Sequence, residues 1–160
     1  MKRLVLKFGG TSVGTIEKIK KVANIIKKRF SEGNEIIVVV SAMAGVTDKL
    51  KEKSNSISSN FDNKELDVLL SSGEQESCSL LTGAIIDLGI QARSWMGWQL
   101  PIITDNNFSS SQIIKIKTED VLKFISNKGV AVIPGFQGVS VESRITTLGR
   151  GGSDLSAVVM

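Results

Sequence analysis

The feature that most constrains the fold is the opening of the chain, where two apolar runs flank an amphipathic segment. Residues 3–8 indicate a strand, and the uninterrupted aliphatic run 36–40 predicts a second strand, buried on both faces. Between them, apolar residues recur every three or four positions and predict one buried face of a helix: Ile16, Ile19, Val22, Ala23, Ile26 and Phe30. Because a right-handed crossover makes two such strands parallel, we expect a βαβ unit whose ligands bind at the carboxyl edge of the sheet.

Strands and helices alternate through the rest of the chain. The expected elements are strands at 90–94, 102–104 and 130–134, and helices at 118–127 and from Ser153 onward. A chain of 160 residues is long enough for about one domain with a single core. We therefore expect one α/β domain over residues 1–160, a three-layer αβα sandwich with a mainly parallel sheet.

The stretch between these two halves is less regular. A helical pattern of leucines breaks at the polar triplet 71–73. Ser72 and Gln75 resemble a capping box there, so we expect a new helix to begin at this point and to end near Gly89. The stretch 54–60 is too polar to pack, and we expect it to form a loop or a lid.

Residue types narrow the chemistry. The single cysteine, Cys78, permits neither an internal disulfide nor a four-ligand zinc cluster, and the absence of histidine removes His-based triads and His metal ligands. The remaining groups suit anion binding and phosphoryl transfer. We expect no nucleic-acid partner, because the basic residues behind the net charge of +4 crowd into 18–29 and 49–53 without interleaved aromatics. No run approaches the ~20 apolar residues of a membrane span and no signal-like segment opens the chain, so we expect a cytoplasmic protein.

The strongest chemical signal is the sequence Lys7-Phe8-Gly9-Gly10 at the end of the first predicted strand. Two glycines let the backbone approach an anion closely, and we expect the turn to run into the N-terminus of the first helix, which attracts phosphate. Lys7 would then reach phosphate oxygens from the strand. The spacing fits neither a Walker A loop nor G-x-G-x-x-G, and a tight strand-to-helix turn with an incidental lysine is the alternative.

Three further segments place polar groups near this edge. The loop 41–47 carries hydroxyls at Ser41 and Thr47, with a plain connecting loop as its alternative. Glu74 is expected in the first turn of a helix, where a carboxylate can also simply complement the helix dipole. The segment Arg150–Asp154 repeats glycines before a helix start, behind an arginine that can grip a carboxylate with two hydrogen bonds; an exposed arginine in a surface turn is the alternative.

Together these segments resemble aspartate kinases of the amino-acid kinase superfamily. The matching motifs occur in the family's order and span nearly the whole chain: Lys7–Ser12, Val40–Thr47, Ser72–Glu74 and Thr147–Asp154. Acetylglutamate, glutamate 5-, carbamate and uridylate kinases share the glycine turn but not this set. The resemblance implies an amino-acid kinase fold and ATP-dependent phosphorylation of the side-chain carboxylate of L-aspartate to 4-phospho-L-aspartate. That reaction is the first step toward lysine, threonine, methionine and diaminopimelate.

The same resemblance implies roles for single residues. It places Lys7 and Asp154 at the reaction centre, and it assigns the phosphates of ATP to Lys7, Phe8, Gly9, Gly10 and Ser41. It pairs Glu74 with the ammonium group of aspartate and Arg150 with a carboxylate, and it adds further substrate contacts at Ser41, Thr47, Gly151, Gly152 and Ser153. At 135–138 we expect a close approach of the backbone to substrate. Asp154 would orient either Lys7 or the metal, and no side chain is assigned as a ligand of Mg²⁺.

The resemblance also bears on the surroundings of these residues. In the family, the chain continues into segments that hold adenine and ribose and then into regulatory ACT domains. We therefore expect a C-terminally truncated part of the catalytic domain, without a regulatory domain and inactive by itself. The full-length protein is expected to use ATP and Mg²⁺ and to form a homo-oligomer, a dimer. The alternatives are a non-catalytic remnant that binds aspartate or a partner, and another amino-acid kinase with a carboxylate acceptor.

Overall fold

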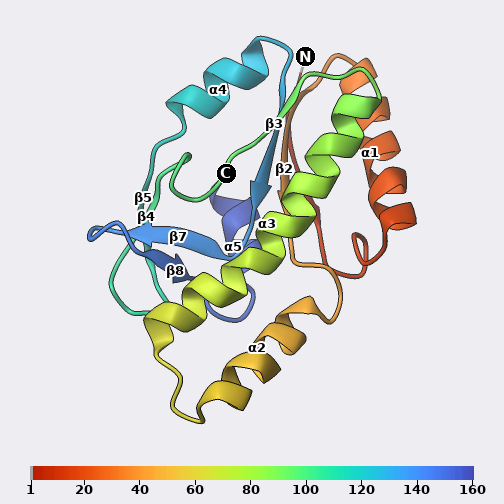
Figure 1. Cartoon of the computed structure of the whole chain (residues 1–160). Helices are drawn as coiled ribbons and strands as arrows, with labels where there is room; N and C mark the ends of the chain where they lie inside the picture. The colour runs from red at the N-terminus through yellow and green to blue at the C-terminus, as the bar shows by residue number, and fades with distance from the viewer. Residues whose placement is uncertain (1) are drawn as a thin grey trace.

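The computed structural model describes residues 2–160, and strands and helices alternate along them (Figure 1). The elements in chain order are β1 (Arg3–Phe8), α1 (Ile16–Ser31), β2 (Glu35–Val40), α2 (Val46–Ile57), α3 (Asn63–Asp87), β3 (Ala92–Ser94), β4 (Ile102–Thr104), β5 (Ile113–Ile116), α4 (Glu119–Ser126), β6 (Val130–Pro134), β7 (Gln137–Ser140), β8 (Ile145–Thr147) and α5 (Gly152–Val159). The predicted opening of strand, helix and strand is confirmed, and α1 ends just before Gly33. In the described part of the chain, no helix combines the length and apolar character needed to cross a membrane.

A parallel four-stranded sheet, in the order β1-β2-β6-β3, forms the centre of the molecule. Side chains of β2 alternate between two apolar cores. Ile36 and Val38 face the core under α1 and α3, whereas Ile37 and Val39 face the core under α4, to which the end of α5 adds Met160. Helices therefore cover both faces of the sheet, which confirms the predicted αβα sandwich.

A second four-stranded sheet, in the order β5-β4-β7-β8, lies beside the first and was not predicted (Figure 1). It is mixed, because β4 runs parallel to β7 while the pairs β4–β5 and β7–β8 are antiparallel. Polar side chains are buried in it: the hydroxyl oxygens of Thr104 and Thr146 lie 2.7 Å apart within the sheet, and the fully buried Gln137 donates to Ser71 O of α3. Of its strands only β4, predicted at 102–104, was expected, and its Ile102 is fully buried in the apolar core under α4. The strands β7 and β8 bury mainly polar side chains, so patterns of alternating apolar residues miss them.

Two predictions between residues 46 and 87 are wrong. The predicted loop 54–60 is helical as far as Ile57, because α2 continues through it and buries Ser54. The predicted break at 71–73 does not exist, and α3 runs without interruption from Asn63, capped by Asp62. Within the continuous helix, the hydroxyls of Ser71 and Ser72 donate to carbonyl oxygens one turn earlier.

The carboxyl ends of β1, β2 and β6 lie together at one edge of the central sheet. Backbone hydrogen bonds join the loops that leave them: Ser41 N donates to Phe8 O at 3.1 Å, and Gly135 N donates to Val40 O at 2.8 Å. Helix α5 packs against the same edge, since Ser156 Oγ accepts from Phe136 N at 3.1 Å. This edge is where ligands of open α/β sheets bind.

Candidate active site

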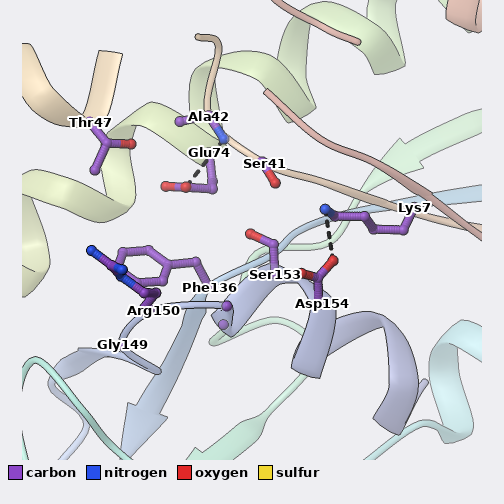
Figure 2. Close-up of a pocket in the computed structure, with 12 residues that line it drawn as sticks. Lys7, Ser41, Ala42, Thr47, Glu74, Phe136, Gly149, Arg150, Ser153 and Asp154 are labelled. Atoms are coloured by element: carbon purple, nitrogen blue, oxygen red, sulfur yellow. Dashed lines mark hydrogen bonds and ion pairs between the residues drawn. The ribbon is translucent and has the colours of Figure 1, made fainter. Parts of the chain in front are cut away.

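A cavity of about 250 Å³ lies at this edge of the sheet (Figure 2). It is lined by side chains and backbone from β1, the loop after β2, α2, α3, the β6–β7 corner and the start of α5: Lys7, Ser41, Ala42, Thr47, Glu74, Phe136, Gly149, Arg150, Gly151, Gly152, Ser153 and Asp154. Nine of the twelve predicted site residues are in this set, and the other three, Phe8, Gly9 and Gly10, are not. The cavity thus brings together residues from both ends of the chain.

Lys7 and Asp154 form an ion pair at one end of the cavity, with Lys7 Nζ 2.8 Å from Asp154 Oδ1 (Figure 2). Lys7 projects from β1, and Asp154 belongs to the first turn of α5. The Asp154 side chain is 70% exposed, so the pair is open to solvent and to a ligand. Exposed pairs of this kind contribute little to stability, about 0–1 kcal/mol. The pair therefore sets the position of the lysine ammonium more than it stabilises the fold.

The glycine turn differs from its prediction in one respect. The turn was expected to lead into the N-terminus of the first helix, and α1 does begin at Ile16, but residues 11–15 separate it from the glycines and the side chain of Thr15 caps it. The intervening residues form turns in which Ser12 N and Val13 N donate to Gly9 O. The glycine turn, and not the N-terminus of α1, therefore directly follows β1 at the ligand edge. The segment between the glycines and the helix is longer than a tight turn requires.

Glu74 is buried in the wall of the cavity, with an exposed fraction of 4%. Its Oε1 accepts a hydrogen bond from Ala42 N at 3.2 Å, whereas its Oε2 has no partner among residues 2–160. Burial raises the pKa of this carboxyl from 4.5 to about 7, although the hydrogen bond from Ala42 opposes the rise. The predicted place in a first helical turn is wrong, because Glu74 lies in the middle of α3. Complementing a helix dipole therefore does not explain it.

The loop after β2 supplies polar groups beside Glu74. Ser41 is half-buried, and its carbonyl oxygen accepts from Ser77 Oγ of α3 at 2.7 Å. Thr47 is in the first turn of α2 and also lines the cavity. Because α3 holds this loop through both the Ala42 amide and the Ser41 carbonyl, the loop and Glu74 form one unit.

The start of α5 closes the cavity on the opposite side. Arg150 is exposed, and the helix begins two residues later, at Gly152. The β6–β7 corner lies so close beneath that a Cβ on Gly135 would come within 2.8 Å of Ser153 Cβ and 2.9 Å of Ser153 Cα. The expected approach of the backbone at 135–138 to substrate stays a prediction; Gly135 contacts α5, and the neighbouring Phe136 lines the cavity.

Three lining residues were not predicted: Ala42, Phe136 and Gly149. The backbone amide of Ala42 donates to Glu74. Every residue except proline has such an amide, so only the position of Ala42 in the loop 41–47 could have indicated it. Phe136 lies in the segment 135–138 that was singled out, and Gly149 directly precedes Arg150. For both residues, the sequence motif beside them already pointed to this part of the cavity.

The charges in the cavity are segregated (Figure 2). Glu74 and Arg150 lie toward one end, the Lys7–Asp154 pair lies toward the other, and Ser41 and Ser153 lie between them. A carboxylate can bind an ammonium group, a guanidinium can bind a carboxylate, and a lysine ammonium can bind phosphate oxygens. The arrangement can thus hold a small amino acid with its ends at Glu74 and Arg150 and an anionic group beside Lys7.

Comparison with known proteins defines the class first: the chain matches the model of the amino acid kinase family over residues 2–160 and belongs to that family. Its relatives point to one kind of member. The aspartokinase of Rickettsia felis is 48% identical over 163 residues, which cover 100% of this chain and 41% of that protein. The aspartokinase of Bacillus sp. strain MGA3 is 44% identical over 157 residues, covering 98% of this chain and 38% of that protein. The chain thus spans about two fifths of these curated relatives.

Solved structures show the same relationship. The chain resembles the aspartate kinase of Synechocystis with a TM-score of 0.84 and 42% identity, covering 99% of this chain and 25% of that one. It also shares its fold with E. coli aspartokinase III, solved in complex with aspartate and ADP, with a TM-score of 0.78, 24% identity, and coverage of 94% and 44%. The predicted amino-acid kinase fold is therefore confirmed.

Proposed function

We propose that this chain provides the aspartate- and phosphate-binding half of an aspartate kinase. The enzyme would transfer the γ-phosphoryl group of ATP to the side-chain carboxylate of L-aspartate, as the first step toward lysine, threonine, methionine and diaminopimelate. The observation that carries the proposal is the buried Glu74 carboxylate, whose Oε2 has no partner within residues 2–160 and which lines a cavity shared with Arg150 and Lys7. A buried acceptor without a partner is costly, and an ammonium group from a ligand would satisfy it. The aspartokinases among the relatives support aspartate as that ligand.

The two ends of aspartate would be held by opposite charges. Glu74 receives the α-ammonium group, and Arg150 holds a carboxylate through two parallel hydrogen bonds. Ser41, Thr47 and Ser153 offer hydroxyl groups along the same cavity. The side-chain carboxylate of the substrate would then point toward Lys7, at the far end of the cavity.

The reaction needs no general base on the protein. The nucleophile is the substrate's own side-chain carboxylate, whose ordinary pKa is ~4, so it is ionised at neutral pH. Its oxygen forms a bond to the γ-phosphorus of ATP, the bond from that phosphorus to the β-γ bridging oxygen breaks, and ADP leaves with the electron pair. The main obstacle is repulsion between two anions. Lys7 offsets this repulsion and stabilises charge on the transferred group, and Asp154 holds the lysine ammonium in place at 2.8 Å.

The residues present also fit the Mg²⁺ that accompanies ATP in such reactions. Residues 2–160 contain no group of three or more acidic, cysteine or histidine side chains that could hold a metal by themselves. Mg²⁺ commonly binds through one or two carboxylates together with substrate phosphates, and Asp154 is the carboxylate beside the proposed phosphate position. When bound there, Mg²⁺ would neutralise charge on the phosphates of ATP.

The test is a coupled ADP-release assay on the full-length protein with ATP and L-aspartate, L-glutamate or N-acetylglutamate. We expect turnover with aspartate and not with the other two acids. Lys7→Ala should lower kcat by about a hundredfold or more, because it removes the charge that stabilises the transition state. The control Lys21→Ala changes an exposed lysine of α1 and should leave kcat unchanged. Turnover restricted to another acid, or a normal kcat for Lys7→Ala, would contradict the proposal.

The 160-residue chain alone should release no ADP. Phosphoryl transfer requires both substrates in near-attack geometry, an effect of up to ~7–11 kcal/mol on the barrier, and the matched relatives are more than twice as long as this chain. The same assay on the purified chain checks this, and aspartate-dependent turnover that Lys7→Ala abolishes would show that these residues form a complete kinase.

A further inference from the structure

Asp67 is a buried carboxylate that the proposed reaction does not use. It lies in α3, its exposed fraction is 0%, and it does not line the cavity. The ion pairs found among residues 2–160 do not include it. Because burying a carboxylate away from any cation is costly, such a group needs several hydrogen bonds in compensation.

Asp67 obtains these bonds from two segments far away in the sequence. Its Oδ2 accepts from Thr147 N and from Ser109 N, both at 2.9 Å. Its Oδ1 accepts from Thr147 Oγ1 at 2.7 Å and from Ser109 Oγ at 3.3 Å. Thr147 is the last residue of β8, and Ser109 belongs to the loop between β4 and β5. One carboxylate therefore ties α3 to both segments.

The loop that Asp67 holds is strained and lies against the cavity wall. Ser109 has a φ of +67°, a left-handed conformation that costs a residue with a Cβ and persists only where its surroundings impose it. A Cβ on Gly149 would lie 3.3 Å from Ser109 O and 3.5 Å from Ser110 Cα, and Gly149 itself has a φ of +73°. The backbone of 109–110 thus forms the surface on which Gly149 rests, directly before Arg150.

The same helix carries Glu74. Asp67 and Glu74 are about two turns apart on α3, which corresponds to roughly 10 Å along the helix axis. Asp67 binds Thr147, which lies three residues before Arg150 in the chain. Glu74 itself lines the cavity. We infer that Asp67 is a positioning residue that holds Arg150 at a fixed distance from Glu74. α3 thereby matches the cavity to the length of the amino acid, an inference that rests on the proposed function.

The test compares three variants of the full-length protein. Asp67→Asn keeps the shape of the side chain but replaces one acceptor with an N–H donor, which faces the donors of Ser109 and Thr147. Thr147→Val removes only the hydroxyl donor and provides a milder variant in case Asp67→Asn does not fold. The control is Thr82→Val, which removes a hydroxyl that is also buried in α3 but donates to Cys78 O within the helix.

Two readouts are needed. Hydrogen exchange measured by mass spectrometry reports on residues 105–111 and 147–152 without any assumption about the reaction. We expect faster exchange in both segments for Asp67→Asn, a smaller change for Thr147→Val and none for Thr82→Val. Steady-state kinetics should show that the aspartate KM rises about tenfold or more in Asp67→Asn, the effect of losing a charge-assisted contact at Arg150, while the ATP KM stays within about twofold.

Each outcome is decisive. Unchanged exchange of 147–152 in Asp67→Asn, or in Thr147→Val where the first variant does not fold, overturns the inference whatever the enzyme's substrate is. Faster exchange in Asp67→Asn together with equal effects on the aspartate and ATP KM values would make Asp67 a general stabiliser of the fold, which also overturns the inference. The same conclusion follows if Thr82→Val raises the aspartate KM as much as Asp67→Asn does. If the wild-type protein does not turn over aspartate, the proposed function fails by itself, and the exchange of 147–152 still decides whether Asp67 holds the Arg150 segment.

Discussion

Replacing Glu74 with glutamine should stabilise the ligand-free protein, and more so as the pH rises. The carboxyl of Glu74 has a pKa raised from 4.5 to about 7 by burial in the cavity wall. Between these two values the native state binds more protons than the unfolded state, so the free energy of unfolding falls as the pH increases. Above pH 7 the loss is complete and stays constant. Glutamine carries no charge at any pH, and the variant avoids this loss.

The pKa shift sets the size of the effect. Each pKa unit corresponds to about 1.4 kcal/mol between the two protonation states, so a rise from 4.5 to about 7 gives an upper value of roughly 3.5 kcal/mol. We expect Glu74→Gln and the wild type to differ little at pH 5. At pH 8 the variant should be more stable by about 1–3 kcal/mol, which is a large part of a typical domain's stability.

The measurement is urea unfolding of the 160-residue chain at pH 5 and pH 8. Fluorescence of Trp95 reports on the fold, because this residue is buried and its ring packs edge-on against Phe124. Glu76→Gln is the matched control, since Glu76 lies in the same helix but is exposed. A stability difference between Glu74→Gln and wild type that does not change with pH would refute the raised pKa and the buried position on which it depends.

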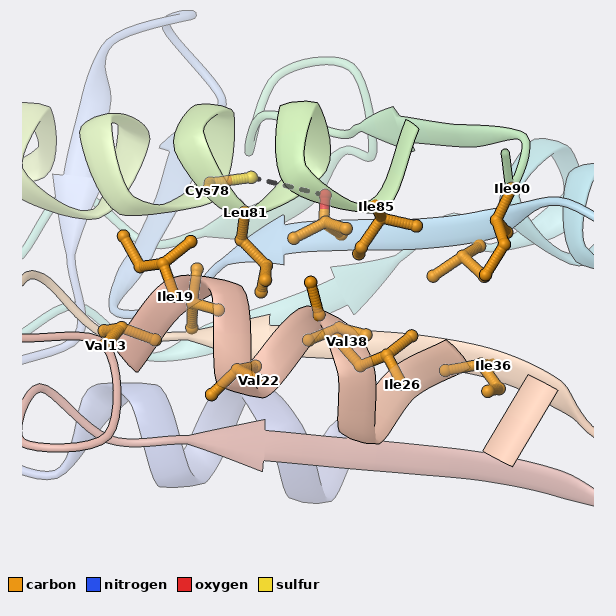
Figure 3. Close-up of a cluster of buried hydrophobic side chains, with 14 residues drawn as sticks. Val13, Ile19, Val22, Ile26, Ile36, Val38, Cys78, Leu81, Ile85 and Ile90 are labelled. Carbon is orange, nitrogen blue, oxygen red and sulfur yellow. Dashed lines mark hydrogen bonds between the residues drawn. The ribbon is translucent and has the colours of Figure 1, made fainter. Parts of the chain in front are cut away.

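Three further predictions concern the cavity and the core. Arg150→Ala should raise the aspartate KM about ten- to a hundredfold with little effect on the ATP KM, and Arg150→Lys should recover only part of the loss because lysine lacks the planar fork; equal effects on both substrates would speak against a direct contact. Gly135→Ala should destabilise the chain by about 1–3 kcal/mol in urea unfolding and weaken aspartate binding, since the new Cβ would lie 2.9 Å from the Ser153 backbone. The control Gly83→Ala, whose Cβ would meet nothing within 4 Å, should be neutral or stabilising. Ile26→Ala should cost about 2–5 kcal/mol, because Ile26 is fully buried among the residues of Figure 3, while Ile25→Ala, at a position 50% exposed, should cost much less; similar losses in urea unfolding would contradict the core assignment.

The two inner strands of the central sheet, β2 and β6, were predictable because their sequences are almost entirely apolar. Residues 36–40 of β2 and 130–134 of β6 are apolar and buried on both faces, and the observed bounds agree with the predicted ones to within a residue. The second sheet was not predictable in this way. β5, β7 and β8 are short, and contacts such as that between Thr104 and Thr146 become visible only after the chain has folded.

The break predicted in α3 shows a related limit. Serine and glycine have low helix propensity, and on that ground residues 71–73 favour an interruption. In the structure, tertiary contacts at the triplet and directly after it override this preference. Gln137 Nε2 donates to Ser71 O, and Glu74 binds the Ala42 amide, so the helix is held at the first residue of the triplet and directly after it.

The candidate site was largely predictable because most of its residues come as short motifs at the ends of strands and the starts of helices, whereas Glu74 lies in the middle of α3. Lys7, Glu74, Arg150 and Asp154 all line the cavity where the carboxyl ends of the strands meet. Asp67 was not predictable, because a single aspartate in a helical pattern does not differ from a solvated surface residue. Only its complete burial and its hydrogen bonds across the fold distinguish it.

The pairing of β2 with β6 restricts the order in which the chain can fold during its synthesis. β1, α1 and β2 are contiguous, so they can associate once residue 40 has left the ribosome, but Ile37 pairs with Ala131 in β6. At a synthesis rate of about 5–20 residues per second, roughly 5–20 s separate the two strands. During that interval the edge of β2 and the face bearing Ile37 and Val39 have no partner from their own chain. A nascent chain of this protein therefore presents an open apolar strand for several seconds, when chaperone binding or pairing with a neighbouring nascent chain competes with its own completion.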